Sequence, residues 1–135
     1  LTLRDAVFGA ERLDAIAAID TPLAQFFTTI VGATLDFDRR VGIDGSTHPD
    51  SLTAAVLLHP ELITASARYH VDVEAGSDLT RGYSAMSWCV EGVNVHGLEP
   101  NATVIESIDS DGFFEYVRGL LALRTEPSRE VRGRA

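Results

Sequence analysis

One segment determines how this chain can be interpreted: Gly45-Ser46-Thr47-His48-Pro49-Asp50-Ser51-Leu52-Thr53-Ala54-Ala55. It predicts the start of a helix, because Pro49 suits a first helical turn, where a missing N–H costs nothing. Asp50 then lies in that turn, beside the positive end of the helix dipole, which favours a carboxylate. A carboxylate close to His48 can begin a site for a hard cation with an acid or base next to it. The simpler interpretation is that Asp50 only starts the helix and that His48 is a loop residue.

Two further helices are predicted before this segment. Apolar residues recur at helical spacing within residues 10–19, which indicates a short helix. Thr21 and Pro22 then form a strong helix start, with Thr21 as the N-cap and Pro22 at the first helical position. This second helix is expected to run to about Arg40, with Phe37 as a core residue.

After the helix that begins at Pro49, the periodicity changes. Apolar and polar residues alternate over residues 67–74, which predicts a half-exposed strand. Residues 75–78 indicate a turn, and residues 82–88 indicate a second strand that would complete a hairpin.

The last third of the chain returns to an alternation of strand and helix. A strand is expected over residues 102–108, followed by a helix over residues 111–123 that Ser110 would cap. The whole pattern predicts an α/β fold with one structured region over residues 1–123. The polar residues 124–135 predict a disordered tail.

Composition narrows the possible functions. The chain has 135 residues and a net charge of -9, which disfavours binding to nucleic acid or to an anionic membrane through bulk electrostatics. No secretory signal is visible, and no apolar window approaches the ~18 residues that a membrane span needs. Cys89 is the only cysteine, so we expect a reduced, cytoplasmic setting and a small buried thiol at this position.

Five groups of motifs follow one another along the chain: Asp20-Thr21-Pro22-Leu23; His48-Pro49-Asp50-Ser51-Leu52; His59-Pro60-Glu61-Leu62; Val71-Asp72-Val73-Glu74 with Leu79-Thr80-Arg81-Gly82; and Pro100-Asn101-Ala102-Thr103-Val104 with Phe113-Phe114. In this order they resemble the C-terminal part of the inosine–uridine-preferring nucleoside hydrolase family. The resemblance extends over almost the whole chain.

The resemblance implies a fold, an activity and two site residues. The family fold packs helices around a mostly parallel sheet in three layers. Its members hydrolyse the N-glycosidic bond of ribonucleosides to ribose and base in nucleoside salvage, depend on Ca²⁺ and commonly form homo-oligomers. By resemblance, Asp50 would be a calcium ligand, and His48 would be the leaving-group acid or would contact the base. The family motif has the histidine directly before the aspartate, whereas Pro49 displaces His48 by one position here.

The resemblance also shows what this sequence lacks. The family's N-terminal cluster, of the form Asp-x-Asp-x-Gly-x-Asp-Asp, holds the calcium ion and activates the attacking water. The nearest run here, Asp36-Phe37-Asp38, has neither the glycine nor the final aspartate pair. The expected function is therefore that of a nucleoside hydrolase fragment. The alternatives are an inactive remnant, an interaction module, or one half of a split enzyme whose partner chain supplies the missing N-terminal half.

Overall fold

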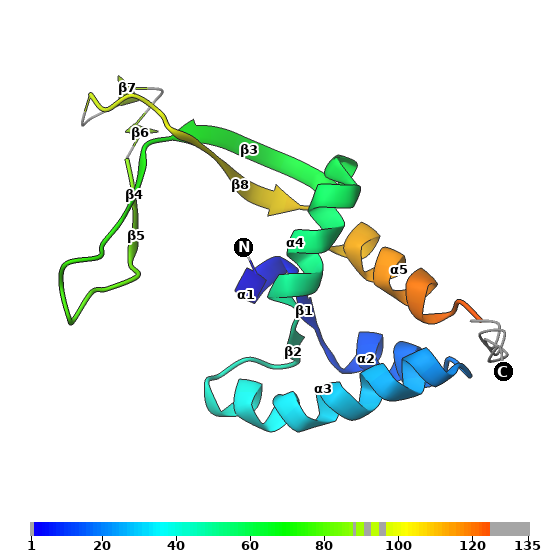
Figure 1. The fold of residues 1–135 in the computed structure, drawn as a ribbon. Helices are drawn as coiled ribbons and strands as arrows, with labels where there is room; N and C mark the ends of the chain where they lie inside the picture. Colours follow the sequence, from blue (N-terminus) through cyan, green and yellow to red (C-terminus); the bar gives the residue numbers. More distant parts are fainter. Residues whose placement is uncertain (1, 88, 91–92, 95–96, 125–135) are drawn as a thin grey trace, which may run out of the picture. The chain divides into compact units, whose positions relative to one another are not determined.

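The computed structural model describes residues 2–87, 89–90, 93–94 and 97–124, and its elements are traced in Figure 1. The chain divides into two compact units. The helical unit comprises Thr2–Leu62 and the chain from Asp109 onward, and the strand unit comprises Ile63–Ile108. The predicted tail after Arg124 and the side chain of Cys89 lie outside the described residues.

The helical unit confirms the four predicted helices. Its elements are α1 (Thr2–Asp5), β1 (Val7–Phe8), α2 (Ala10–Ala17), α3 (Pro22–Arg40), β2 (Ser46–Thr47), α4 (Pro49–Leu58), a 3-10 turn (Pro60–Leu62) and α5 (Ser110–Leu121). Strand β1 pairs with β2 in antiparallel fashion, which brings the start of the chain to the residues that precede α4.

Two helix caps in this unit show where local signals succeed and fail. Thr21 caps α3 as predicted, since its hydroxyl accepts a hydrogen bond of 3.1 Å from the backbone N–H of Ala24. The prediction for α5 is wrong by one residue. Asp109 is the cap and accepts a bond of 2.9 Å from Gly112, while the Ser110 hydroxyl donates to the carbonyl oxygen of Asp5. Asp109 therefore caps α5, and the hydroxyl of Ser110 bonds instead to the backbone of Asp5, far away in the sequence.

The core of the helical unit is built around Phe8. Its ring is fully buried and lies 5.5 Å from the ring of Phe113 and 5.4 Å from that of Phe114, so β1 packs directly on α5. Phe37 is not in this core: it is 66% exposed, which contradicts the prediction. Asp38 on the next position of α3 is buried instead, because the buried face of α3 lies to one side of Phe37.

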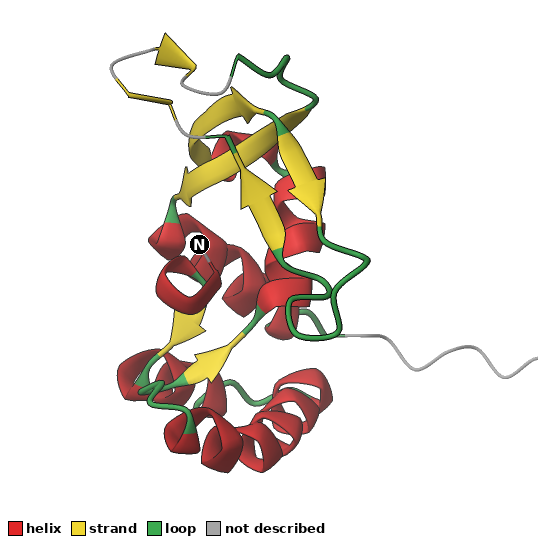
Figure 2. Cartoon of the chain, turned by 90° about the vertical axis from the view of Figure 1, so that its left-hand side faces the viewer, coloured by secondary structure: helices red, strands yellow, loops and turns green. Residues whose placement is uncertain are grey.

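The strand unit consists of short antiparallel pairs, drawn in yellow in Figure 2. Its strands are β3 (Ile63–Tyr69), β4 (Val71–Val73), β5 (Ser84–Met86), β6 (Cys89–Val90), β7 (Val93–Asn94) and β8 (Ala102–Ile108). The longest pair joins β3 to β8, and β4 forms the predicted hairpin with β5.

The strand predicted over residues 67–74 begins earlier and is divided between β3 and β4 at His70. At this point the backbone N–H of His70 donates to the hydroxyl of Ser87, and the Ser87 N–H donates to the carbonyl oxygen of His70. A side chain therefore replaces one rung of the ladder, which separates the β3–β8 pair from the β4–β5 pair.

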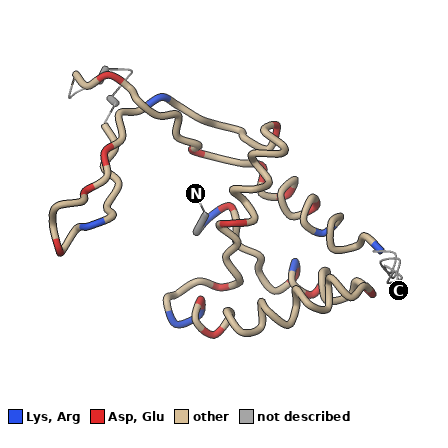
Figure 3. Tube along the Cα trace, in the orientation of Figure 1, with Lys and Arg blue, Asp and Glu red and all other residues tan. Residues whose placement is uncertain are grey.

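The mixture of helices and strands confirms the α/β class. Every strand pairing in the described part of the chain is antiparallel, so the mostly parallel sheet of the family fold is not formed among these residues. Acidic and basic residues are interspersed along the trace in Figure 3, so the net charge is spread over many elements. Within the residues described, no helix is long and apolar enough to cross a membrane.

Candidate functional site at the start of helix α4

The chain enters α4 through Gly45, a position at which any side chain would be strained. Gly45 has a φ of 142°, and a Cβ atom placed there would lie 2.6 Å from the carbonyl oxygen of Phe8. This close approach lets β2 pair with β1, and the backbone N–H of His48 extends the contact by donating to Ala6 over 2.9 Å. The backbone of the segment Ser46–His48 is therefore fixed before the helix begins.

Asp38, near the end of α3, also fixes this segment, through hydrogen bonds to Thr47. One carboxylate oxygen accepts a hydrogen bond of 3.2 Å from the backbone N–H of Thr47, and the other accepts one of 3.4 Å from the Thr47 hydroxyl. Asp38 is 5% exposed, so these bonds satisfy a buried carboxylate close to the end of α3. This role of Asp38 was not predicted from the sequence. Its spacing of nine residues from Thr47 carries no local signal.

His48 lies at the N-cap of α4, but its ring is turned into the apolar core. The ring centroid is 4.4 Å from that of Phe8 and 5.3 Å from that of Phe27, and the residue is 9% exposed. Its Nε2 atom is buried and has no hydrogen-bond partner among the described residues. Burial lowers the pKa of His48, and the charge of Asp38 offsets part of that shift. The neutral imidazole is thus favoured, and it can act as an acceptor or donor of a hydrogen bond more readily than as an acid.

Asp50 has the opposite surroundings. It is exposed in the first turn of α4, directly after Pro49 at the first helical position. The carboxylate is therefore accessible to a cation, and the amide groups of the helix start lie close to it. Among the described residues, no group of three or more His, Cys, Asp or Glu side chains could hold a metal ion. The structure thus brings His48 and Asp50 to one helix start, with one side chain buried and the other in solvent.

The other histidines of the described chain have structural partners. His59 caps the end of α4, and its Nδ1 atom lies 2.9 Å from the carboxylate of Glu61. His70 interacts with the carbonyl oxygen of Glu99 and with Asp72. His96 lies outside the described residues.

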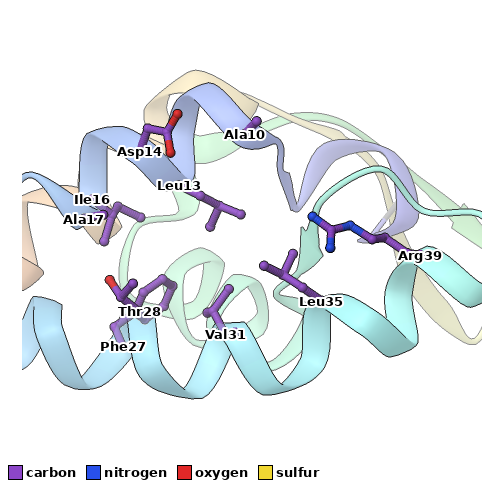
Figure 4. Close-up of a pocket in the computed structure, with 11 residues that line it drawn as sticks. Ala10, Leu13, Asp14, Ile16, Ala17, Phe27, Thr28, Val31, Leu35 and Arg39 are labelled. Atoms are coloured by element: carbon purple, nitrogen blue, oxygen red, sulfur yellow. The ribbon is translucent and has the colours of Figure 1, made fainter.

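Two of the cavities that border the helices of this unit involve α3. The first, of about 290 Å³, lies between α2 and α3, and Figure 4 shows Leu13 and Ile16 on one helix facing Val31 and Leu35 on the other. Its lining is mainly apolar and includes neither His48 nor Asp50. The second, of about 350 Å³, adjoins the helix start, because His48 and Ser51 contribute to its wall together with residues of α3.

Comparison with known proteins gives the family. The family model described as "Inosine-uridine preferring nucleoside hydrolase" matches residues 1–115. The pyrimidine-specific ribonucleoside hydrolase RihA of Citrobacter koseri is 34% identical over 119 residues, which are 84% of this chain and 35% of that protein. The same enzyme of Salmonella gallinarum is 33% identical over 112 residues, which are 78% of this chain and 33% of that protein.

Solved structures agree at the level of the fold. An inosine-guanosine nucleoside hydrolase superposes with a TM-score of 0.71 and 20% identity, over 89% of this chain and 36% of that one. A purine-preferring ribonucleoside hydrolase from Gardnerella vaginalis gives a TM-score of 0.67 and 16% identity, over 90% of this chain and 38% of that one. The chain spans about a third of the length of the curated relatives that it matches. With a family match over residues 1–115, the chain belongs to the inosine-uridine preferring nucleoside hydrolase family.

Proposed function

We propose that this chain forms part of a ribonucleoside hydrolase that cleaves the N-glycosidic bond to release ribose and a free base. The observation that carries the proposal is the family match over residues 1–115, because it includes the whole segment that leads into α4. Two relatives are named as pyrimidine-specific and two solved structures as acting on purine nucleosides, so the proposal extends to ribonucleosides as a class.

Asp50 is the proposed metal ligand, and the proposed metal is Ca²⁺. An exposed carboxylate is a suitable oxygen ligand for that ion, but calcium takes about six to eight oxygens. The described residues of this chain do not form such a set by themselves, so we derive no step through the ion. Residues beyond those described here would have to complete the site.

His48 is the proposed catalytic residue, and its role is to contact the leaving base or to protonate it. Its lowered pKa opposes proton donation near neutral pH, so contact through the neutral ring is the first of these roles. The orphaned Nε2 atom supports this, since a buried ring nitrogen without a partner gains from a hydrogen bond to a ligand. The aromatic packing around the ring would have to open to admit the base.

We also propose a cellular role and an assembly state for the enzyme. The role is nucleoside salvage in the cytoplasm. The assembly is a homo-oligomer, formed once the catalytic domain is complete. The support is the family relationship, because the relatives named above are ribonucleoside hydrolases.

The test is release of reducing sugar from uridine, cytidine and inosine, with Ca²⁺ or with a chelator. The 135-residue chain is assayed alone and mixed with the remaining two thirds of a related ribonucleoside hydrolase. We expect calcium-dependent hydrolysis in the mixture that Asp50→Asn lowers at least about 100-fold. Asp44→Asn, which removes another exposed carboxylate from the preceding loop, is the matched control and should retain activity.

Two outcomes separate the alternatives. Hydrolysis only in the mixture supports a split enzyme, and hydrolysis by the chain alone excludes a remnant. Complex formation without hydrolysis of any nucleoside would overturn the enzymatic proposal and would leave an interaction module. Absence of both complex and activity would identify an inactive remnant.

A further inference from the structure

His70 joins three segments of the strand unit. Its backbone N–H donates a hydrogen bond of 3.1 Å to the hydroxyl of Ser87, which follows β5, and its carbonyl oxygen accepts one of 2.9 Å from the Ser87 N–H. The Nδ1 atom of its ring lies 2.8 Å from the carbonyl oxygen of Glu99, in the segment that precedes β8. The backbone of His70 therefore holds one neighbouring segment, and its side chain holds another.

Both ring nitrogens of His70 face an acceptor. Besides the contact of Nδ1 with Glu99, the Nε2 atom lies 3.2 Å from the carboxylate of Asp72 on β4. A neutral imidazole has one N–H group, whereas an imidazolium has two. Only the protonated ring can therefore donate to both oxygen atoms at the same time.

The neutral ring must leave one of these oxygen atoms without a donor. An ionised acceptor binds an N–H group more strongly than a neutral carbonyl does, so Asp72 competes with Glu99 for the single proton. When that proton is on Nε2, the lone pair of Nδ1 faces the carbonyl oxygen of Glu99, and the contact becomes repulsive. Loss of the positive charge thus weakens the bond from His70 to the segment before β8.

The other bonds between these segments involve groups that do not titrate. The side chain of Asn101 bonds to both backbone groups of Val71, and the Asn101 N–H donates to the carbonyl oxygen of Tyr69 over 3.0 Å. Amide groups keep the same charge across the physiological pH range. They align the segment 99–101 beside the start of β4, and the ring of His70 adds a contact whose strength depends on a proton.

The charged residues of the neighbouring elements are mostly acidic. Asp72 on β4 touches the ring, the exposed Glu99 carries a second negative charge, and Glu106 on β8 is bonded to another side chain. The cation is Arg68 on β3, whose guanidinium donates to a backbone carbonyl oxygen over 2.7 Å. The hydrogen bond to Glu99, followed by the contact with Asp72, raises the pKa of His70, although desolvation opposes the shift.

We propose that His70 is a pH-dependent clasp of the strand unit: its protonated ring fastens the segment 99–101 to the start of β4, and release of the proton loosens that contact. Because its pKa is raised, the ring contributes stability below the unfolded value of about 6.5, and this contribution is lost as the pH rises through the folded pKa. The strand unit is therefore held more tightly in mildly acidic than in mildly alkaline solution. This inference does not depend on the proposed function.

The test is amide hydrogen exchange measured by NMR on the full 135-residue chain, from about pH 5 to about pH 9. The Asn101 amide reports on the clasp, because it bonds to Tyr69 across the same contact. We expect its exchange rate, divided by the intrinsic rate at each pH, to rise at least about threefold as His70 loses its proton. The imidazole of His70 should show two N–H groups at the acidic end of the range.

Three variants assign the response to the clasp. His70→Gln removes the titration and should make the exchange ratio of Asn101 independent of pH. Asp72→Asn keeps the ring and should lower the midpoint and reduce the change, because the neutral ring loses the charged competitor for its N–H group. His59→Gln is the matched control, since it removes a histidine that lies 2.9 Å from a glutamate in the helical unit and should leave the response of Asn101 unchanged.

The outcomes that contradict the clasp are equally specific. An Asn101 exchange ratio that stays constant through the titration of His70, or that falls as the pH rises, would overturn the proposal. A full response in His70→Gln or in Asp72→Asn would overturn it too, as would loss of the response in His59→Gln. If His70→Gln does not fold, the wild-type chain and Asp72→Asn decide the question, because both keep the ring.

Discussion

Each of the two units of this chain is stabilised internally by a different kind of interaction. In the helical unit, aromatic rings pack around Phe8, and His48 is drawn into that packing. In the strand unit, short antiparallel pairs are joined by side-chain hydrogen bonds, and His70 is held by polar partners. The same residue type thus has opposite surroundings in the two units. The difference shows that a functional residue in this chain must be judged by its packing as well as by its sequence motif.

The largest effect should come from removing the centre of the aromatic packing. Phe8→Ala deletes a fully buried ring that touches His48, Phe113 and Phe114. We expect the free energy of unfolding of the helical unit to fall by about 3–5 kcal/mol. Chemical denaturation followed by circular dichroism measures it. Substitution of the exposed Phe26 by Ala should lower the free energy of unfolding much less. Equal losses of stability at Phe8 and Phe26 would show that burial of the ring does not determine its contribution.

The next effect concerns the backbone that leads into α4. Gly45→Ala places a Cβ atom against Phe8 in a conformation that other residues rarely adopt, so we expect a loss of about 2–3 kcal/mol. Gly42→Ala is the control, because its φ of 84° is also positive but nothing lies within 4 Å of the added atom. It should cost about 1 kcal/mol. Equal melting temperatures for the two variants would show that the contact with Phe8 carries no strain.

A smaller effect is expected in the strand unit. The side chain of Asn101 accepts a hydrogen bond from the N–H of Val71 and donates one to its carbonyl oxygen, so it replaces a neighbouring strand. Asn101→Ala should cost about 1 kcal/mol locally and accelerate hydrogen exchange at the Val71 amide. Thr103→Ala, an exposed change on β8, is the control. Faster exchange throughout the helical unit would contradict the separation of the two units.

The smallest effect is the difference in titration between the two histidines. Burial lowers the pKa of His48, so its contribution to stability is present above its unfolded value of about 6.5 and is lost as the pH falls through its folded pKa. The hydrogen bond to the carbonyl oxygen of Glu99, followed by the contact with Asp72, raises the pKa of His70. Its contribution is present below about 6.5 and is lost as the pH rises through its folded pKa.

Imidazole resonances followed by NMR across this pH range give both values in one experiment. Asp72→Asn should lower the pKa of His70 and leave that of His48 unchanged, because it removes the negative charge that favours the protonated ring of His70. Two histidines that titrate together would show that the ring of His48 is solvated in solution. That result would also remove the main objection to His48 as a proton donor.

Local signals were sufficient for most of the helices. Thr21 and Pro22 mark the start of α3 because a cap and a first-turn proline act within one turn. Pro49 marks α4 for the same reason. The prediction for α5 was wrong because Ser110 bonds to a residue 105 positions away, which no local pattern reveals. The division of the predicted strand at His70 was missed for a similar reason, since Ser87 lies 17 positions away.

The candidate site was predicted less completely. Periodicity showed that α3 has apolar faces but could not show which one is buried, so Phe37 was taken for a core residue and Asp38 was not connected to Thr47. The sequence motif correctly brought His48 and Asp50 to one helix start. It could not show that the ring of His48 packs against Phe8, because that contact depends on the pairing of β1 with β2.

The two hydrogen bonds of the Thr21 hydroxyl limit which amino acids can replace threonine at this position. It accepts a hydrogen bond from Ala24 at the start of α3 and donates one of 2.6 Å to the carbonyl oxygen of Leu121 at the end of α5. Aspartate caps helices equally well, yet it has no proton to give to Leu121. Besides threonine, only serine and asparagine among the usual capping residues can both accept and donate with one side chain, so homologous chains that keep this helix pair should vary at position 21 only among these three amino acids.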